Sequence, residues 1–263
     1  MTKTPDHQTI TPHEDVNGVL FALARDLTAT FGDHFVGLYL TGSLSYGDFD
    51  RASSDIDFLA VLGQPMNGRQ RAAVAEMHTR VAAAYPLWRR RIEGSYVTRE
   101  MLASVDPPRQ SRPYVNGGKL WTPDPTYGQE WTMNGYALYE NGIAVVGPDP
   151  KTVFRNVGYD AYRDASIRSL HEEWAPLVRD ASLLESSHHQ AYVTLTVCRI
   201  LYTARNHGLA SKRSASRWVK QTYGMPWREL IEKAEGWQHG GELREAGTVQ
   251  AFIAFALAQA RRA

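Results

Sequence analysis

TGSLSYGDFDRASSDIDFLAVL (Thr41–Leu62) carries a Gly-Ser pair and then an Asp-Ile-Asp triplet at the head of an apolar run. Eleven residues (44–54) separate Ser43 from Asp55. The apolar run predicts a strand, and on a strand Asp55 and Asp57 project from the same face. Ile56 between them should face the core. Two carboxylates at this spacing repel each other, so we expect a positive charge beside them.

The first interpretation is that a divalent cation supplies this positive charge. Mg²⁺ is held in proteins by one or two carboxylates together with substrate phosphates. Gly42 lets a backbone approach a phosphate closely, and N–H groups at a turn such as Gly42-Ser43 favour anions. The alternative is an ordinary Ser/Asp-rich loop with helix caps. The apolar segments on both sides favour a nucleoside triphosphate site with Asp55 and Asp57 as metal ligands.

Glu93, in RRIEGSYV (90–97), is the candidate for a third carboxylate. A strand that follows a helix can pair beside the Asp strand, which would bring Glu93 close to Asp55 and Asp57. There it could act as general base, as a further metal ligand, or as both. The alternative is an exposed strand carboxylate. The nearest rival, Glu100, lies in an expected helix cap.

The first half of the chain reads as an α/β unit. Thr11-Pro12-His13-Glu14 predicts the capped start of a helix that Gly32 ends. Residues 103–135 are rich in Pro and Gly and predict an irregular, functional loop. A short helix, a turn and a strand should follow, closed by Pro148 and Pro150. The other expected elements are strands at 34–41, 54–62 and 90–98 and a helix at 68–85.

Strand signals largely vanish after about residue 150. We therefore expect two domains, 1–155 and 156–263, the second an all-α helical bundle that closes the active-site cleft. Helical patterns are present at 162–178, 189–208, 214–224, 226–236 and 248–262.

Composition excludes several classes of protein. The formal net charge of +1 lacks the basic excess of a nucleic-acid-binding protein. Arg89-Arg90-Arg91 is expected at a solvated helix end. The single Cys198 allows no internal disulfide and should be a buried core residue. Residues 1–10 lack a signal-peptide pattern and no apolar run is long enough to span a bilayer, so we expect a cytoplasmic protein without membrane partners.

These motifs resemble the polymerase-β-like nucleotidyltransferase superfamily, through the Gly-Ser pair and the Asp-Ile-Asp triplet eleven residues later. The whole chain looks like the aminoglycoside nucleotidyltransferases that modify streptomycin and spectinomycin. The first half matches through LYLTGSLSYGDFDRASSDIDFLAVL and ALYENGIAVVGPDP, and the second through YVTLTVCRILYTARNHGLASKRSASRWV.

The resemblance implies roles for individual residues. Asp55 and Asp57 hold Mg²⁺, Glu93 is the general base, and Ser43 and Ser54 contact the nucleotide phosphates next to Gly42. Arg199 and Lys212 reach ATP from the helical domain. Arg199 could instead be a helix-surface ion pair.

The acceptor side of the resemblance is less well matched. The family carries an acidic residue just before the arginine-bearing helix, where this chain has ESSHHQAYV (185–193). The candidate acceptor residues are Trp121, Trp131, Glu172, Glu185 and His189. Either tryptophan could stack on a sugar or merely anchor a loop, and Glu172 beside Glu173 could be a solvated face.

The sequence thus predicts a monomeric adenylyltransferase that uses Mg²⁺ and ATP. Its acceptor would be a small polar molecule, most plausibly an aminoglycoside or aminocyclitol antibiotic such as spectinomycin or streptomycin. Two alternatives stay open. One is transfer to another metabolite, a protein or RNA; the other is a nucleotide-binding homologue without turnover.

Overall fold

The computed structural model describes residues 9–238 and 240–260, which fold as two compact units. Unit 1 comprises the segments up to Phe49, Ser54–Tyr127 and Ala137–Asn156. Unit 2 comprises Asp50–Ser53, Gly128–Tyr136 and the chain from Val157 onward. Two segments of the predicted first domain, 1–155, are therefore part of unit 2. The sequence predictions for residues 1–8 and 261–262 fall outside the described residues.

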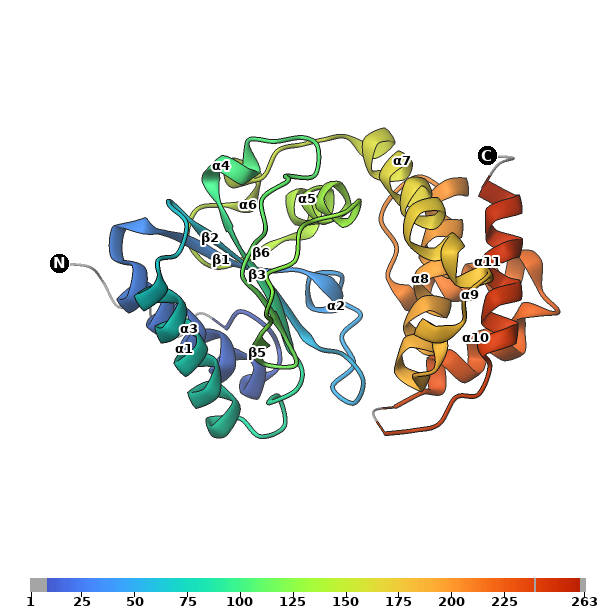
Figure 1. The fold of residues 1–263 in the computed structure, drawn as a ribbon, viewed down its shortest axis with the longest axis horizontal. Coiled ribbons are helices and arrows are strands. Elements are labelled where there is room, and N and C mark those ends of the chain that lie inside the picture. The colour runs from blue at the N-terminus through green and yellow to red at the C-terminus, as the bar shows by residue number, and fades with distance from the viewer. Residues whose placement is uncertain (1–8, 239, 261–263) are drawn as a thin grey trace. The chain divides into compact units, whose positions relative to one another are not determined.

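Unit 1 is built on a mixed sheet of six strands within the described residues, in the order β5-β4-β3-β2-β1-β6 (Figure 1). β2 and β3 are parallel, and β1 is antiparallel to both β2 and β6. β4 is antiparallel to β3 and to β5. The strands are β1 (Phe35–Leu40), β2 (Ile56–Leu62), β3 (Ile92–Thr98), β4 (Tyr114–Asn116), β5 (Lys119–Leu120) and β6 (Ile143–Val146).

Two helices, α1 (Glu14–Phe31) and α3 (Gly68–Ala84), lie side by side in Figure 1 and share one core with the sheet. Their apolar stripes bury residues such as Leu20 and Met77, while Ile56 and Phe58 face them from β2. The expected strands at 34–41, 54–62 and 90–98 and the helix at 68–85 are confirmed. The shorter elements of unit 1 are η1 (Gly32–His34), α2 (Gly42–Ser45), α4 (Arg99–Leu102) and α6 (Pro150–Val153); α5 (Glu130–Asn141) is divided between the units.

Two local predictions are wrong. The first helix begins at Glu14 with His13 as its N-cap, rather than at a capping box on Thr11. The Thr11 backbone N–H and hydroxyl instead donate to Asn17 Oδ1, each at 2.9 Å. Residues 103–135 are not wholly irregular, because β4 and β5 form a hairpin whose turn is Gly117-Gly118, both with positive φ.

Within the described part of the chain after Val157, the regular elements are helices. α8 is central to them, and its buried face includes Val193, Val197 and Cys198. Phe252 and Ile253 pack from α11 into the same core, and Cys198 is buried as expected. The helices are α7 (Tyr159–Ser169), η2 (Leu170–Trp174), η3 (Ala175–Val178), η4 (Ser182–Leu184), α8 (Ser187–Arg205), α9 (Lys212–Tyr223), α10 (Trp227–Gly236) and α11 (Ala246–Ala260).

Among the residues described, none of the helices combines the length and the apolar character that crossing a bilayer requires.

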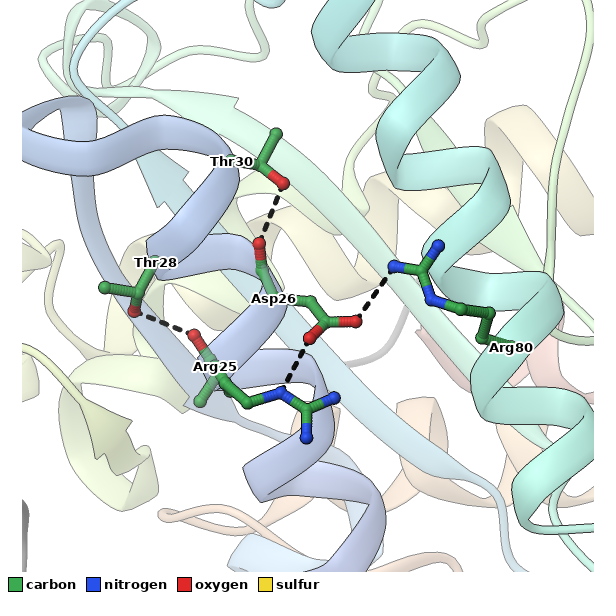
Figure 2. A network of polar contacts seen from close by, with 6 residues as sticks. Arg25, Asp26, Thr28, Thr30 and Arg80 are labelled. Carbon is green, nitrogen blue, oxygen red and sulfur yellow. Dashed lines mark hydrogen bonds and ion pairs between the residues drawn. The ribbon is translucent and has the colours of Figure 1, made fainter.

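A polar network joins α1 to α3 on the surface of unit 1. Figure 2 shows Asp26 between two arginines: Arg25 Nε lies 2.8 Å from Asp26 Oδ1, and Arg80 Nη2 of α3 lies 3.0 Å from Oδ2. The Thr30 hydroxyl donates to the Asp26 carbonyl at 2.7 Å. The hydrogen bond from Arg25, followed by that from Arg80, holds the pKa of the Asp26 carboxyl below its usual value.

Asp26→Asn should lower the free energy of unfolding at pH 7 by roughly 0.5–1 kcal/mol, the range of exposed ion pairs. A carboxyl whose folded pKa is depressed contributes stability above its unfolded pKa and loses it as the pH falls through the folded value. The difference between the proteins should therefore shrink as the pH falls through the folded pKa of Asp26. Urea unfolding at pH 7 and at a series of acidic pH values measures this. Asp33→Asn, at an exposed position of η1, is the control; an equal loss there would contradict the network's role.

Candidate active site

Three chain segments meet where β1 ends and β2 and β3 begin. β1 is antiparallel to β2, so its C-terminal end lies beside the start of β2, and the Thr41 N–H donates to the Asp57 carbonyl at 3.1 Å. β3 runs parallel to β2, so its start lies at the same edge. The pairing thereby brings Gly42-Ser43, Asp55–Asp57 and Glu93 to one place in unit 1.

Asp57 and Glu93 are direct partners in the parallel register of β2 and β3. Directly paired residues project from the same face of a sheet, and neighbouring strands lie about 4.8 Å apart. Ile56 and Phe58 face the opposite way, into the core, where they are 0% and 2% exposed. Asp55 immediately precedes β2. The sheet thus presents the carboxylates of Asp57 and Glu93 side by side on the face opposite the core.

Gly42 is required at the end of β1 for two reasons. Its φ of +65° lies in the left-handed region that side chains disfavour. A Cβ there would also lie 2.0 Å from Asp57 Oδ2. The Asp57 carboxylate therefore occupies the space that a side chain at residue 42 would need. Ser43 follows in the short helix α2 and is partly buried, as is Ser54 before the Asp-Ile-Asp triplet.

Arg91 is a site residue that sequence reasoning missed. Its Nε lies 3.6 Å from Asp55 Oδ1, and Nη2 donates to the Ser54 carbonyl. The guanidinium stacks 4.7 Å above the Trp88 ring. The expectation of a solvated arginine triplet is wrong for Arg91, which is 9% exposed. Arg89 and Arg90 are exposed, so the positive charge beside Asp55 comes from the third arginine of the triplet.

Tyr114 is the second missed residue, and it lies on β4. Its hydroxyl donates to Glu93 Oε1. Tyr114 pairs with Ser95 of β3, two residues beyond Glu93 and on the same face. The Gly117-Gly118 pair between short segments is typical of a tight hairpin and was the signal that could have revealed this strand.

The donors at the head of β2 fit Mg²⁺ delivered by a nucleotide. Across residues 9–238 and 240–260, no group of three or more His, Cys, Asp or Glu side chains is placed to hold a metal ion. Mg²⁺ bound with a nucleotide does not need such a group, since one or two carboxylates and the phosphates complete its shell. Asp55 and Asp57 supply hard oxygen donors of that kind. The role of Glu93 as a further ligand stays a prediction.

The two predicted cations lie in unit 2. Arg199 is a partly buried residue of α8, and Lys212 begins α9. The Lys212 ammonium lies 4.4 Å from the centroid of the Tyr192 ring, a cation–π contact within the same unit. Their contact with nucleotide phosphates stays a prediction.

The two candidate tryptophans differ in exposure. Trp121 is 51% exposed, and its ring meets that of Tyr114 edge-on with the centroids 5.8 Å apart. Trp131, on α5, is 8% exposed and belongs to unit 2. Of the two, Trp121 has surface for a ligand and lies next to the partner of Glu93.

Acidic side chains cluster in unit 2 around Glu172, which accepts a hydrogen bond from Gln129 Nε2 at 2.9 Å. The neighbouring Glu173 has its pKa raised to about 6, chiefly by partial loss of water and then by the charges of Glu130 and Glu172. The charges of these acids therefore repel one another, which sets the cluster apart from an ordinary solvated face of mixed charge.

Two further acceptor candidates stand near the start of α8. His189 is partly buried, its ring stacked with that of Tyr192 at 6.1 Å between centroids. Burial, and then the charge of His188, lowers its pKa, so the imidazole is neutral at pH 7. Glu185 is exposed and lines a groove of about 790 Å³ together with Ser187, Glu242 and Arg244. Histidine carries no negative charge in either protonation state, so His189 does not supply the charge that the resemblance expects there.

Comparison with known proteins finds one family model and a similar solved structure. Residues 152–259 match the family model described as aminoglycoside adenylyltransferase, C-terminal domain. The fold is similar to that of spectinomycin adenyltransferase AAD(9) from Enterococcus faecialis, solved with ATP and spectinomycin. The TM-score is 0.72 at 16% identity, over 93% of this chain and 98% of that chain. No curated protein matches by sequence.

The sheet and these matches indicate the class of fold: it is similar to that of a solved nucleotidyltransferase. More particularly, residues 152–259 belong to the C-terminal domain family of the aminoglycoside adenylyltransferases. The resemblance to the aminoglycoside nucleotidyltransferases is thereby confirmed.

Gly42→Ala should lower turnover by about 100-fold, the order of loss expected when a reacting group is displaced by about 1 Å. The added carbon would push the Asp57 carboxylate aside. Gly47→Ala is the matched control, because Gly47 also has a positive φ (+68°) but a Cβ there meets nothing within 4 Å. Pyrophosphate release from Mg·ATP and thermal unfolding compare the two. Equal losses of turnover would show that backbone strain, rather than Asp57, is responsible.

Glu173→Gln should raise the thermal midpoint at pH 7.5 and leave it unchanged at pH 4.5. A carboxyl with a raised folded pKa destabilises the fold once it ionises, between its unfolded value and about 6. Since Glu173 is exposed, the gain should stay below about 1 kcal/mol. Glu232→Gln, on the exposed side of α10, is the control. A midpoint that falls in Glu173→Gln at pH 7.5 would contradict the repulsion.

Proposed function

We propose that the enzyme transfers AMP from ATP to a hydroxyl group of an aminoglycoside or aminocyclitol antibiotic, with spectinomycin and streptomycin as the leading candidates. The observation that carries this proposal is the direct pairing of Asp57 with Glu93, with Gly42 packed against Asp57. This arrangement sets a carboxylate suited to a metal-bound triphosphate beside one suited to accept a proton. Such a modification would confer resistance, and its use of ATP favours a cytoplasmic setting.

In this mechanism Glu93 takes the proton of the acceptor's hydroxyl group. The oxygen of that hydroxyl attacks the α-phosphorus of ATP. The new P–O bond forms as the bond to pyrophosphate breaks, giving an AMP ester and pyrophosphate. Asp55 and Asp57 would hold Mg²⁺, which when bound supplies positive charge against the charge that develops on the phosphates. Ser43, Ser54, Arg199 and Lys212 would contact the phosphates. The geometry does not require Glu93 itself to be a metal ligand.

A cationic acceptor is supported by the charges of unit 2. In the acidic group of Glu130, Glu172 and Glu173, the charges of the first two help to raise the pKa of Glu173 above its ordinary value. An acceptor bearing ammonium or guanidinium groups would relieve that repulsion. The solved structure of similar fold contains spectinomycin, an aminocyclitol, together with ATP. Because a histidine carries no negative charge, we assign the negative charge expected for the acceptor site to these glutamates.

The proposal predicts pyrophosphate release that depends on one antibiotic. Purified protein with Mg·ATP would be assayed against spectinomycin, streptomycin and kanamycin. Glu93→Gln should lower kcat by about 10²–10⁴-fold, the range for a general base, while calorimetry shows Mg·ATP binding retained. Asp57→Asn should lose both turnover and Mg·ATP binding. Glu100→Gln, at an exposed glutamate of α4, is the matched control and should behave as the unmodified enzyme.

Other outcomes discriminate between the alternatives. Mg·ATP binding without release for any antibiotic would contradict the acceptor assignment and leave transfer to another metabolite, protein or RNA. The absence of release for any hydroxyl acceptor, with binding intact, would identify a nucleotide-binding homologue without turnover. Full activity of Glu93→Gln would remove Glu93 from the mechanism.

A further inference from the structure

A row of side chains extends from the carboxylates toward the β4–β5 edge of the sheet. Asp57 on β2 pairs with Glu93 on β3, and Tyr114 on β4 lies beyond them on the same face. The Tyr114 hydroxyl donates to Glu93 Oε1. Trp121, which follows β5, meets the Tyr114 ring edge-on. Glu93, the expected general base, thus accepts a hydrogen bond from a residue of the β4–β5 hairpin.

The position of Tyr114 is set by contacts other than Glu93. The Arg112 guanidinium lies 5.4 Å from the Tyr114 ring centroid, while the Trp121 ring lies 5.8 Å away. Arg112 is itself held in place, and it is 6% exposed. It donates hydrogen bonds to the Ser95 hydroxyl at 3.3 Å and to the Thr126 carbonyl at 2.6 Å. Its guanidinium lies 3.5 Å from the centroid of the Tyr127 ring. The Trp121 N–H donates to the Tyr114 carbonyl at 2.8 Å. The Tyr114 ring therefore has partners other than the Glu93 carboxylate that hold its position.

We infer that Tyr114 is a positioning residue, which fixes the orientation in which the Glu93 carboxylate takes the acceptor's proton. This inference rests on the proposed AMP transfer. A carboxylate has two oxygens and rotates about the bond that carries it. The Tyr114 hydroxyl, held on Oε1, restricts that rotation. Because Tyr114 contacts the proposed general base, we expect its effect to fall on the chemical step.

The substitution Tyr114→Phe tests the inference because it removes the hydroxyl and keeps the ring that Arg112 and Trp121 contact. We expect kcat to fall about 10- to 100-fold, with KM for Mg·ATP and for the acceptor within about twofold. Tyr96→Phe is the matched control: Tyr96 is on β3, but its hydroxyl lies 2.7 Å from His78 Nε2 in the core. Its kcat should stay within about twofold of the unmodified enzyme. A kcat in Tyr114→Phe equal to or above that of the unmodified enzyme would overturn the inference.

A double-mutant cycle separates positioning from a general structural role. If Tyr114 acts through Glu93, Tyr114→Phe should cause no further loss of kcat in the Glu93→Gln background. A second loss as large as the first would show that the phenol acts independently of Glu93 and would overturn the inference.

Spectroscopy tests the contact between Tyr114 and Glu93 without relying on turnover. A failure of the proposed function can therefore be distinguished from a failure of this inference. The ultraviolet difference between unmodified enzyme and Tyr114→Phe gives the absorption of this one phenol. It should shift to shorter wavelength when Glu93→Gln removes the charged acceptor from its hydroxyl. An unchanged spectrum would overturn the inference even in an enzyme that transfers AMP. A shift in a protein with no turnover on any acceptor would refute the proposed function while the contact stands.

Discussion

The parallel register of β2 and β3 is the constraint on which the site depends. It sets Asp57 opposite Glu93, and a slip of one residue would turn one of the two carboxylates into the core. The next pair keeps this register in place. Phe58 lies opposite Gly94, and a Cβ at Gly94 would come within 2.5 Å of the Phe58 ring. A larger residue brought opposite Phe58 by a slip would meet that ring, so core packing on one face secures the chemistry on the other.

Much of unit 1 could be predicted because its signals are local. Alternating or continuous apolar runs between turn residues mark β1, β2 and β3, and the stripe from Val74 to Val81 marks α3. The order of elements then indicates that β3 pairs beside β2, and this pairing alone is enough to predict that Glu93 lies near the aspartates. The start of α1 could not be found in the same way. The backbone N–H and the hydroxyl of Thr11 donate to Asn17, six residues further along the chain. They are therefore not engaged in a capping box.

The residues that the sequence did not reveal are those defined by tertiary contacts. Arg89, Arg90 and Arg91 are identical in type and adjacent, and only the turn after α3 decides which of them is buried over Trp88. Tyr114 belongs to a three-residue strand inside a segment rich in Pro and Gly, where short-range propensity predicts a loop. Its pairing with β3 is stabilised by partners such as Arg112 and Trp121 that no local pattern identifies.

The contact between Arg91 and Asp55 has a consequence for how metal and fold are linked. Many small metal-binding domains fold only when the ion arrives, because unneutralised ligands repel one another. Here a guanidinium of the chain itself, buried over Trp88, already offsets part of that charge at Asp55. If Asp55 holds Mg²⁺ as we propose, folding would be largely uncoupled from divalent-ion concentration, and the acidic site would persist when Mg²⁺ is scarce. Chelation would then stop turnover reversibly without unfolding the protein.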